Sequence, residues 1–516
     1  MHVVHEDERS ILFCDREPIR WQGADGIGGL AWVEGEPWRD GVASWADAAI
    51  RGACGLVIEG RRRLVHSSVS GLARLYWLDE RGATYFASRI DPLVTSSPGR
   101  LSVDWDAWAS TMILRYPLRE RTPFAEIRRL GPYSTIRRRL GRNRVEHPPW
   151  PWAEVEPGLG LEEGADAWVA ALREMLDPLP RQLICPLSGG RDSRIVICGV
   201  PPGRDLTALT VDDDEGSRFE EDHAEPVVRA LGVEHEELRG TAEDYPADWD
   251  TRARAVEYQF VDHPWLVPLA QRIDGATVPV LDGGAIDITF QAGERFYTAA
   301  ALDTSRPREA SVALWETVRR FGHAQLALVD RFRDPLVERA REQFMAEMRR
   351  FEGHPSQGIL GVYWTRTVRG TSSYPNGLLG DRARMIVPGA SHALASIALA
   401  IPSEAKRGAH LYSAVLDRLA PQIADLPSTT GSDRSPPTLP RRWCSEPALA
   451  AYRELVATGP LAGRVAPELR AWLETPAPGE LGGHLRMGLE SVALLHAWWQ
   501  RYRDRLGEVD AAELFG

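Results

Sequence analysis

The sequence predicts an α/β fold made of two units: a β-rich unit over residues 1–150, and a unit over residues 160–516 that combines a parallel sheet with a mostly helical final third. Two observations predict it. In the first unit, short apolar or alternating runs recur between Gly and Arg clusters, which is typical of short strands. Beyond residue 160, strand-like runs alternate with helical patterns, which favours a parallel sheet covered by helices on both faces.

Within the first unit, strands are expected at residues 55–59, 64–66 and 83–87, and a further strand-like stretch follows residues 131–136. Residues 148–152 read P-P-W-P-W, and an acidic stretch with Gly and Pro continues to Gly164. Because Pro and Gly interrupt regular structure, this segment is expected to separate the two units.

The second unit opens with an amphipathic helix, because Trp168, Leu172 and Leu176 fall on one helical face that ends at Pro178. The expected elements that follow are strands at residues 183–187, 206–211 and 278–281, and a helix at residues 221–231 closed by Gly232. Near the C-terminus an apolar stripe repeats at helical spacing, and core packing is its expected role: Leu485, Leu489, Val492, Leu495 and Trp499.

The composition limits the possible function classes. The chain has 516 residues, 43% of them hydrophobic, and a formal net charge of −12. No run of about 18 apolar residues occurs, so no membrane span is expected. The acidic N-terminus lacks the apolar stretch of a secretory signal. The negative charge disfavours a nucleic-acid partner. Scattered cysteines without a C-x-x-C pair fit reduced thiols in the cytoplasm, which is the expected location.

The strongest local signal is the hexapeptide S-G-G-R-D-S at residues 188–193, between a strand-like and a helix-like run. Paired glycines let the backbone approach phosphate oxygens, and the first N–H groups of a helix point at them. A carboxylate at Asp192 would repel bare phosphate, so it suggests a shared Mg²⁺. The spacing differs from the P-loop pattern. It is similar to the pyrophosphate loop of the ATP-pyrophosphatase enzymes; a plain Ser/Gly turn is the alternative.

Six segments, in this order, resemble the asparagine synthetase family over nearly the whole chain. They are residues 85–93 (Y-F-A-S-R-I-D-P-L), 122–132 (T-P-F-A-E-I-R-R-L-G-P), 188–193, 220–235, 281–287 (L-D-G-G-A-I-D) and 384–402. The resemblance implies a first domain shaped like an N-terminal-nucleophile (Ntn) amidohydrolase over residues 1–150. It implies an ATP-pyrophosphatase domain of the adenine-nucleotide α-hydrolase-like type over residues 160–516.

Departures from the family pattern narrow the function. Glutamine-using members expose a cysteine directly after the initiating methionine, and that thiol attacks the glutamine amide. Here the second residue is His2 and the nearest cysteine is Cys14. A first domain without glutaminase chemistry is implied, as in β-lactam synthetases and lasso-peptide cyclases (macrolactam synthetases), which use an amine already present in the substrate. Gly284 stands where β-lactam-forming members carry a tyrosine, and residues 426–434 lack the family's catalytic lysine.

The resemblance implies a site for ATP and Mg²⁺. The residues expected to contact the nucleotide and pyrophosphate are Leu187, Ser188, Gly189, Gly190, Asp192, Ser193, Val211 and Gly283. Leu187 and Val211 are expected to offer backbone groups to adenine and ribose. The expected metal carboxylates are Asp192 and Asp287, whereas residues 212–214 (D-D-D) are expected to form a solvated loop.

Three further residues are catalytic candidates. Arg434 is expected to replace the missing lysine, since a guanidinium can hold phosphate bidentately, and Arg441 and Arg442 are the neighbouring alternatives. Glu257 and Asp262 precede the second metal loop and are expected to face the acceptor amine or to hold water. Their alternative role is that of surface or helix-capping carboxylates. His263 is an alternative base, and Lys406 is expected to be dispensable for the chemistry.

The first functional hypothesis is an ATP-dependent carbon–nitrogen ligase that forms AMP and pyrophosphate, specifically a lasso-peptide macrolactam cyclase. It would adenylate a side-chain carboxylate of a short precursor peptide, which the N-terminal amine then attacks. This hypothesis allows a leader peptidase and a leader-binding protein as partners. The alternative is a β-lactam synthetase-like or asparagine synthetase-like amide ligase acting on a small amino acid derivative. A tRNA-modifying adenylating enzyme and a non-enzymatic binding protein are less favoured.

Overall fold

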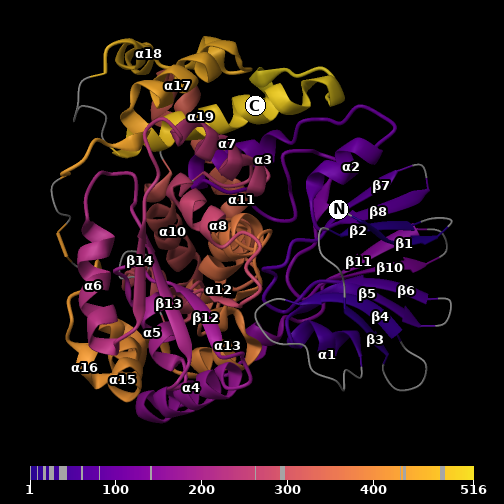
Figure 1. The fold of residues 1–516 in the computed structure, drawn as a ribbon. Helices are drawn as coiled ribbons and strands as arrows, with labels where there is room; N and C mark the ends of the chain where they lie inside the picture. The colour runs from indigo at the N-terminus through magenta and orange to yellow at the C-terminus, as the bar shows by residue number, and fades with distance from the viewer. Residues whose placement is uncertain are drawn as a thin grey trace.

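The computed structural model describes residues 2–516 except 8–9, 15–18, 23–27, 34–43, 60–61, 81, 140–141, 262, 291–296, 323, 431, 434–436 and 477–482. Strands dominate the first unit and helices the second (Figure 1). The change from strands to helices falls between β11 (Arg142–Glu146) and α4 (Leu161–Leu176). The regular structure in this interval is the short 3-10 helix η2 (Pro151–Glu154). The proline-rich segment expected to separate the units occupies this interval.

Two sheets form the first unit, with strand orders β1-β2-β8-β7-β9 and β11-β10-β6-β5-β4-β3. Their remaining strands are β1 (His2–Asp7), β2 (Ser10–Cys14), β3 (Ile19–Gln22), β4 (Gly28–Val33), β5 (Ala53–Glu59), β6 (Arg62–His66), β7 (Tyr76–Glu80), β8 (Ala83–Ala87), β9 (Arg128–Arg129) and β10 (Thr135–Arg139). Leu56 and Phe86 meet in one cluster between the sheets, whereas the neighbouring Val57 packs under α1 (Trp45–Ile50). With α2 (Ile90–Ser96) on the other outer face, the layers run helix, sheet, sheet, helix.

The second unit is built on a parallel sheet with the order β14-β13-β12-β15-β16. Its strands are β12 (Gln182–Pro186), β13 (Asp205–Val211), β14 (Glu234–Leu238), β15 (Val280–Leu281) and β16 (Met385–Ile386). Successive side chains of a strand point to opposite faces. Leu183 and Cys185 therefore pack under the helices of one face, whereas Ile184 joins the core on the other.

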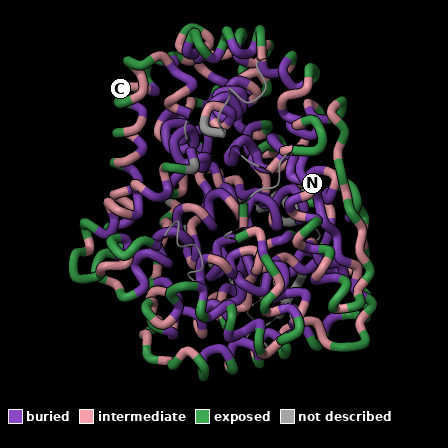
Figure 2. The backbone as a smooth tube through the Cα atoms, turned by 90° about the vertical axis from the view of Figure 1, so that its left-hand side faces the viewer, coloured by how far each residue is buried: buried purple, intermediate pink, exposed green. Residues whose placement is uncertain are grey.

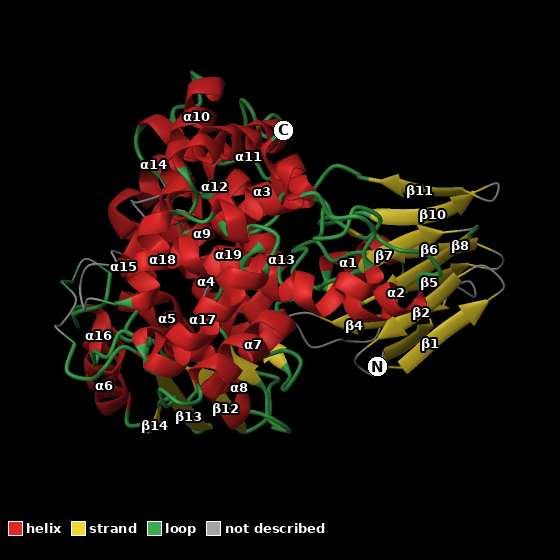
Figure 3. Cartoon of the chain, turned by 90° about the horizontal axis from the view of Figure 1, so that it is seen from above, coloured by secondary structure: helices red, strands yellow, loops and turns green. Residues whose placement is uncertain are grey.

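Helices cover both faces of this sheet, while the strands of the first unit lie together on the right of Figure 3. The first face carries α4, α5 (Arg191–Gly199), α6 (Phe219–Leu231), α13 (His392–Ala400) and α15 (His410–Leu419). The other helices are α7 (Tyr245–Ala255), α8 (Val267–Arg272), α9 (Ile286–Thr289), α10 (Pro307–Val318), α11 (Arg333–Met348), α12 (Gln357–Val362), α14 (Ser403–Lys406), α16 (Pro421–Ala424), α17 (Glu446–Thr458), α18 (Pro467–Glu474) and α19 (Gly483–Tyr502).

Most elements expected from sequence periodicity are present. The expected strand at 83–87 coincides with β8, and those at 183–187 and 206–211 overlap β12 and β13. The expected helix at 221–231 is α6, and Gly232 ends it with a φ of 66°, a left-handed conformation that glycine adopts at low cost. The apolar stripe near the C-terminus lies on α19, where Leu489, Val492 and Leu495 are fully buried.

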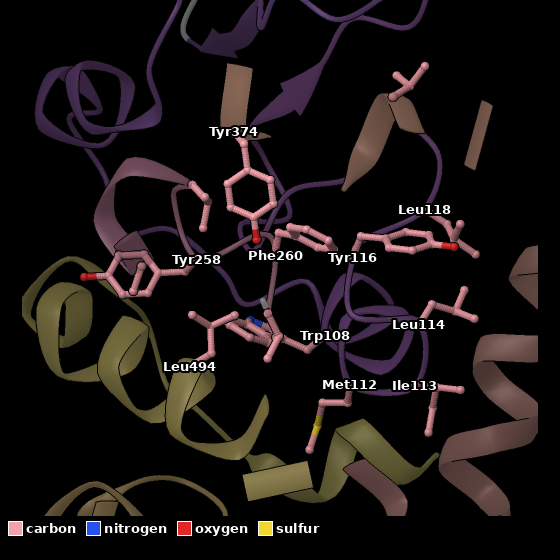
Figure 4. Packing of buried hydrophobic residues seen from close by; sticks show 14 of the residues in the cluster. Trp108, Met112, Ile113, Leu114, Tyr116, Leu118, Tyr258, Phe260, Tyr374 and Leu494 are labelled. Carbon is pink, nitrogen blue, oxygen red and sulfur yellow. The ribbon is translucent and has the colours of Figure 1, made fainter. Parts of the chain in front are cut away.

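One hydrophobic core joins the two units. Helix α3 (Trp105–Leu114) belongs to the first unit, yet it packs against α11 and α19 of the second. The rings of Trp108 and Trp498 lie 5.3 Å apart between centroids, and Figure 4 shows Trp108 and Met112 close to Leu494. Buried residues run through the interior in Figure 2, with exposed ones at the edge. Among the described helices, none has the length and apolarity to cross a bilayer.

His496 is a neutral histidine locked inside this core. Its Nε2 accepts from the backbone N–H of Leu461 at 3.1 Å, and its Nδ1 is bonded to the carbonyl of Leu455. A proton on Nε2 would face another donor, and burial lowers the pKa of His496 to about 4. His66 is also enclosed, and burial lowers its pKa to about 4 as well, so it too is neutral in the folded protein.

We predict that the free energy of unfolding falls as the pH drops from 6.5 towards 4. In that window the unfolded rings bind protons that the folded rings do not, so each contributes a loss of up to about 3 kcal/mol. Urea unfolding across this window measures the loss, and His496→Gln should make it shallower. The matched control His410→Gln changes an exposed histidine and should leave the slope unchanged. Stability that stays flat or rises on acidification would contradict this assignment.

Candidate active site

A cavity of about 540 Å³ opens at the carboxyl ends of β12, β13 and β15. The chain passes from β12 to β13 on one side and later to β15 on the other side of β12. Such a reversal of strand order splays the loops apart and leaves a crevice for a ligand. The cavity is lined by Pro186, Leu187, Ser188, Asp192, Ser193, Leu209, Val211, Asp213, Glu215, Glu220, His263, Trp265, Leu266, Leu269, Asp282, Gly283, Gly284, Arg486 and Met487.

The S-G-G-R-D-S segment forms the turn between β12 and α5, as its sequence predicts. Ser193 Oγ accepts from the Ser188 N–H at 3.1 Å, and the Gly190 N–H donates to Ser188 Oγ at 3.2 Å. The Gly189 N–H donates to the Glu220 carboxylate at 2.7 Å, so this amide already binds an oxyanion. The hydroxyls of Ser188 and Ser193 lie in the cavity lining at the start of a helix, a position that suits phosphate oxygens.

Arg194 holds this turn in place from behind. Its guanidinium donates to the carbonyls of Gly189 at 3.2 Å, His223 at 3.1 Å and Leu426 at 2.9 Å, and also to that of Pro427. The Thr429 N–H adds a bond to the Gly189 carbonyl at 3.0 Å. The segment where the family's lysine is expected therefore lies directly against the turn at residues 188–193, which we call the phosphate loop after its expected role.

The second loop meets the first in close contact. A Cβ at Gly283 would lie 2.7 Å from the Ser193 nitrogen and 2.8 Å from the Asp192 carbonyl carbon, so only glycine allows this approach. Asp282, which directly follows β15, lines the cavity and accepts from the Gly284 N–H at 2.7 Å. Burial raises the pKa of Asp282.

The structure places the two metal carboxylates expected from the sequence differently. Asp192 lines the cavity, but Asp287 lies in the first turn of α9 and does not. The chain takes a left-handed turn at Ala285, with a φ of 69°, before α9 begins. Asp282 therefore replaces Asp287 as our candidate. Carboxylate oxygens suit Mg²⁺, which binds through one or two carboxylates plus substrate phosphates. No cluster of three or more metal-ligating side chains occurs among the described residues.

The other expected nucleotide contacts are distributed as follows. Ser188, Ser193, Gly283 and Val211 line the cavity, whereas Gly189 and Gly190 do not. Leu187 also lines it, but its backbone is occupied: its N–H donates to the Leu209 carbonyl at 2.8 Å and its carbonyl accepts from Thr210 at 2.7 Å. The backbone groups of Leu187 that were expected to meet adenine or ribose therefore already have partners within the protein.

Glu257 is placed away from the cavity. Its buried carboxylate pairs with Arg74 at 3.3 Å and Arg89 at 3.5 Å and accepts from the Ile90 N–H. These partners belong to the first unit, so Glu257 ties the units together instead of facing a substrate amine. Asp262 and Arg434 lie outside the described residues.

The alternative cations have structural partners. Arg442 is buried between Asp214, at 2.6 Å, and Asp248. The expected solvated loop at residues 212–214 is therefore in fact buried, and its last residue forms an ion pair. Arg441 lies 3.4 Å from Glu215. Lys406 is enclosed and donates to the carbonyls of Thr289 and Ala398, and burial lowers its pKa to about 7.

Sequence reasoning missed one cation of the cavity wall. Arg486, on α19, lines the cavity and is bonded to Glu215 and, at 2.9 Å, to Glu490. These carboxylates raise the pKa of Arg486 well above its usual value, so it stays charged. Arg486 follows β13 by more than half of the chain, so no local pattern could have placed it there. Trp265, Leu266 and Leu269 add an apolar wall.

The comparison with known families agrees with this geometry. Residues 181–407 match the family model described as asparagine synthase. The match covers the phosphate loop, the Asp282 loop and the whole parallel sheet, and it supports the asparagine synthetase family for this chain. This family implies ATP-dependent amide ligase activity, and its members are carbon–nitrogen ligases that produce AMP and pyrophosphate. No curated protein matches the chain.

We predict that Gly283→Ala weakens ATP binding by at least about tenfold, because its Cβ would displace the backbone of Asp192 and Ser193. Calorimetric titration of the full chain with ATP and Mg²⁺ measures this. Gly158→Ala is the matched control, since no atom lies within 4 Å of the Cβ it adds. Unchanged ATP affinity in Gly283→Ala would contradict the contact between the two loops.

Proposed function

We propose that this protein is a macrolactam cyclase of the lasso-peptide type. It would adenylate a side-chain carboxylate of a short precursor peptide and let the peptide's own N-terminal amine displace AMP. The observation that carries the proposal is the cavity in which the S-G-G-R-D-S turn faces Asp282 beside an apolar wall. The turn and Asp282 suit a nucleotide, and the apolar wall suits the side chains of a peptide substrate.

The chemistry assigns separate tasks to these residues. The carboxylate oxygen attacks the α-phosphorus of ATP, and the bond to the β-phosphate oxygen breaks. The turn at residues 188–193 would hold the leaving pyrophosphate through its N–H and hydroxyl groups. Asp192 and Asp282 would hold Mg²⁺, which neutralises charge on the phosphates when bound. The amine then attacks the acyl carbon, loses a proton and expels AMP.

Support for an amine carried by the substrate comes from the thiols. Glutamine-derived ammonia needs a reactive thiolate, and reactive cysteines sit in exposed, electropositive surroundings. Burial raises the pKa of Cys198 to about 12 and raises that of Cys185 and Cys444 as well, and Cys54 is fully buried. None of these four thiols is suited to attack an amide; the side chain of Cys14 lies outside the described part of the structure.

The layer order of the first unit also supports the proposal. Two face-to-face sheets between outer helices fit the Ntn-type arrangement that the family resemblance implies. We propose that this unit serves as a scaffold without hydrolytic activity. The first unit is needed for the fold because α3 packs against α11 and α19. Removing this unit would expose the apolar faces of those two helices.

We predict that the full chain, incubated with ATP, Mg²⁺ and a linear peptide bearing a free N-terminus and an acidic side chain, produces AMP, pyrophosphate and a peptide lighter by one water. Asp192→Ala and Asp282→Ala should each lower the rate by at least about a hundredfold, because the departing pyrophosphate loses its metal. Asp287→Ala should lower it less, because its side chain does not line the cavity. Mass spectrometry and nucleotide chromatography measure both products.

ADP and phosphate as products would contradict adenylation. Turnover of a free β-amino acid, without turnover of the peptide, would contradict the cyclase hypothesis and favour the β-lactam synthetase-like alternative. A variant Asp287→Ala that loses as much activity as Asp192→Ala would restore the sequence-based metal pair.

A further inference from the structure

A second cavity, of about 430 Å³, lies between the two units. One side comes from β7 and residues 119–132 of the first unit, and the other from the end of α11 and residues 364–369. It shares no lining residue with the cavity described above. Its size falls within the range of small-molecule sites, and the proposed adenylation does not use it.

The buried wall of this cavity carries Arg369, which is only 4% exposed. Its Nε and Nη2 donate to the carbonyls of Pro117 and Arg121, and Nη2 also to the amide oxygen of Gln259 at 3.2 Å. Among the described residues, no carboxylate forms a direct ion pair with it and no acceptor bonds to its Nη1, although Glu120 and Glu347 attract it from a longer distance. A buried guanidinium that no carboxylate contacts directly is costly, so an anion that reached it in the cavity would stabilise it.

Arg350 provides a second guanidinium at the rim. It stacks on the ring of Trp364 with 4.1 Å between the guanidinium carbon and the ring centroid. Stacking uses the flat face of a guanidinium and leaves its edge donors available. Within the described part of the chain, no carboxylate forms an ion pair with Arg350. Two guanidinium edges in one cavity match the two oxygens of a carboxylate.

Glu120 offers the opposite charge. Its Oε1 accepts from the Gly131 N–H at 2.9 Å and lies 3.8 Å from His147 Nδ1. No donor among the described residues reaches its Oε2. Glu347, the other acid of the cavity, is already held by Trp364 Nε1 at 2.7 Å and Arg119 at 3.2 Å. Glu120 is therefore the carboxylate open to a ligand's ammonium group.

The rest of the lining is apolar and comes from Trp77, Leu130, Pro132 and Val368. We propose that this cavity binds a free amino acid with an apolar side chain, its carboxylate on Arg350 and Arg369 and its ammonium on Glu120. Because the two units supply opposite walls, the bound amino acid would bridge them and stabilise their contact. The site is independent of the proposed cyclase activity.

Calorimetric titration of the full chain with L-leucine and L-phenylalanine tests the proposal. At least one should bind and raise the melting temperature, since a ligand that prefers the folded state stabilises it. 4-Methylpentanoate, which lacks the ammonium group of leucine, and isopentylamine, which lacks its carboxylate, should each bind at least about tenfold more weakly than leucine. Arg350→Gln and Glu120→Gln should weaken amino acid binding to a similar extent and leave ATP binding unchanged.

Arg349→Gln is the matched control, because Arg349 is an exposed neighbour outside the cavity lining. Arg350 is exposed as well, so its substitution should not impair folding. The proposal fails if neither amino acid binds, if binding is as tight in Arg350→Gln and Glu120→Gln as in the wild type, or if inorganic phosphate binds as tightly as the amino acids. Loss of amino acid binding with cyclisation retained would support it.

Discussion

The arrangement of the candidate active site depends on the buried guanidinium of Arg194. It binds carbonyls from the phosphate loop, from α6 and from residues 426–427, which are far apart in sequence. A buried charge held only by carbonyl oxygens is costly to disturb, because removing any partner leaves it less compensated. Burial lowers the pKa of Arg194 to about 10. The hydrogen bonds of Arg194 thereby fix the turn at residues 188–193, whose other side faces the cavity.

The two units are held by both apolar and ionic contacts. Helix α3 inserts its buried side chains between α11 and α19, and Arg74 forms an enclosed pair with Glu257. The segment after Glu257 then runs from the unit boundary to the cavity, where His263 and Trp265 line the wall. His263 keeps a left-handed backbone, with a φ of 56°. The contact between the units thus positions one wall of the candidate active site.

Residues whose roles are set by local sequence could be predicted, and those set by distant partners could not. Periodicity located β8, β12, β13 and α6, and the paired glycines located the turn at residues 188–193. The edge strand β14 was missed because its sequence E-H-E-E-L is polar and half exposed, without an apolar run. The sequence motif pointed to Asp287 and not to Asp282, which lines the cavity, because a motif fixes the order of residues but not the direction of their side chains. The local sequence suggests solvated carboxylates at Glu257 and at residues 212–214. Their burial depends on ion pairs with Arg74 and Arg442, which are distant in the sequence.

The central claim is that a carboxylate becomes bonded to AMP in this cavity before an amine attacks it. Transfer of heavy oxygen tests it directly. With a peptide whose acidic side chain carries heavy oxygen, adenylation moves one labelled atom into the phosphate of AMP when the amide forms. Mass spectrometry of the released AMP should therefore detect the label. Label in inorganic phosphate, or amide formation with unlabelled AMP, would contradict the account.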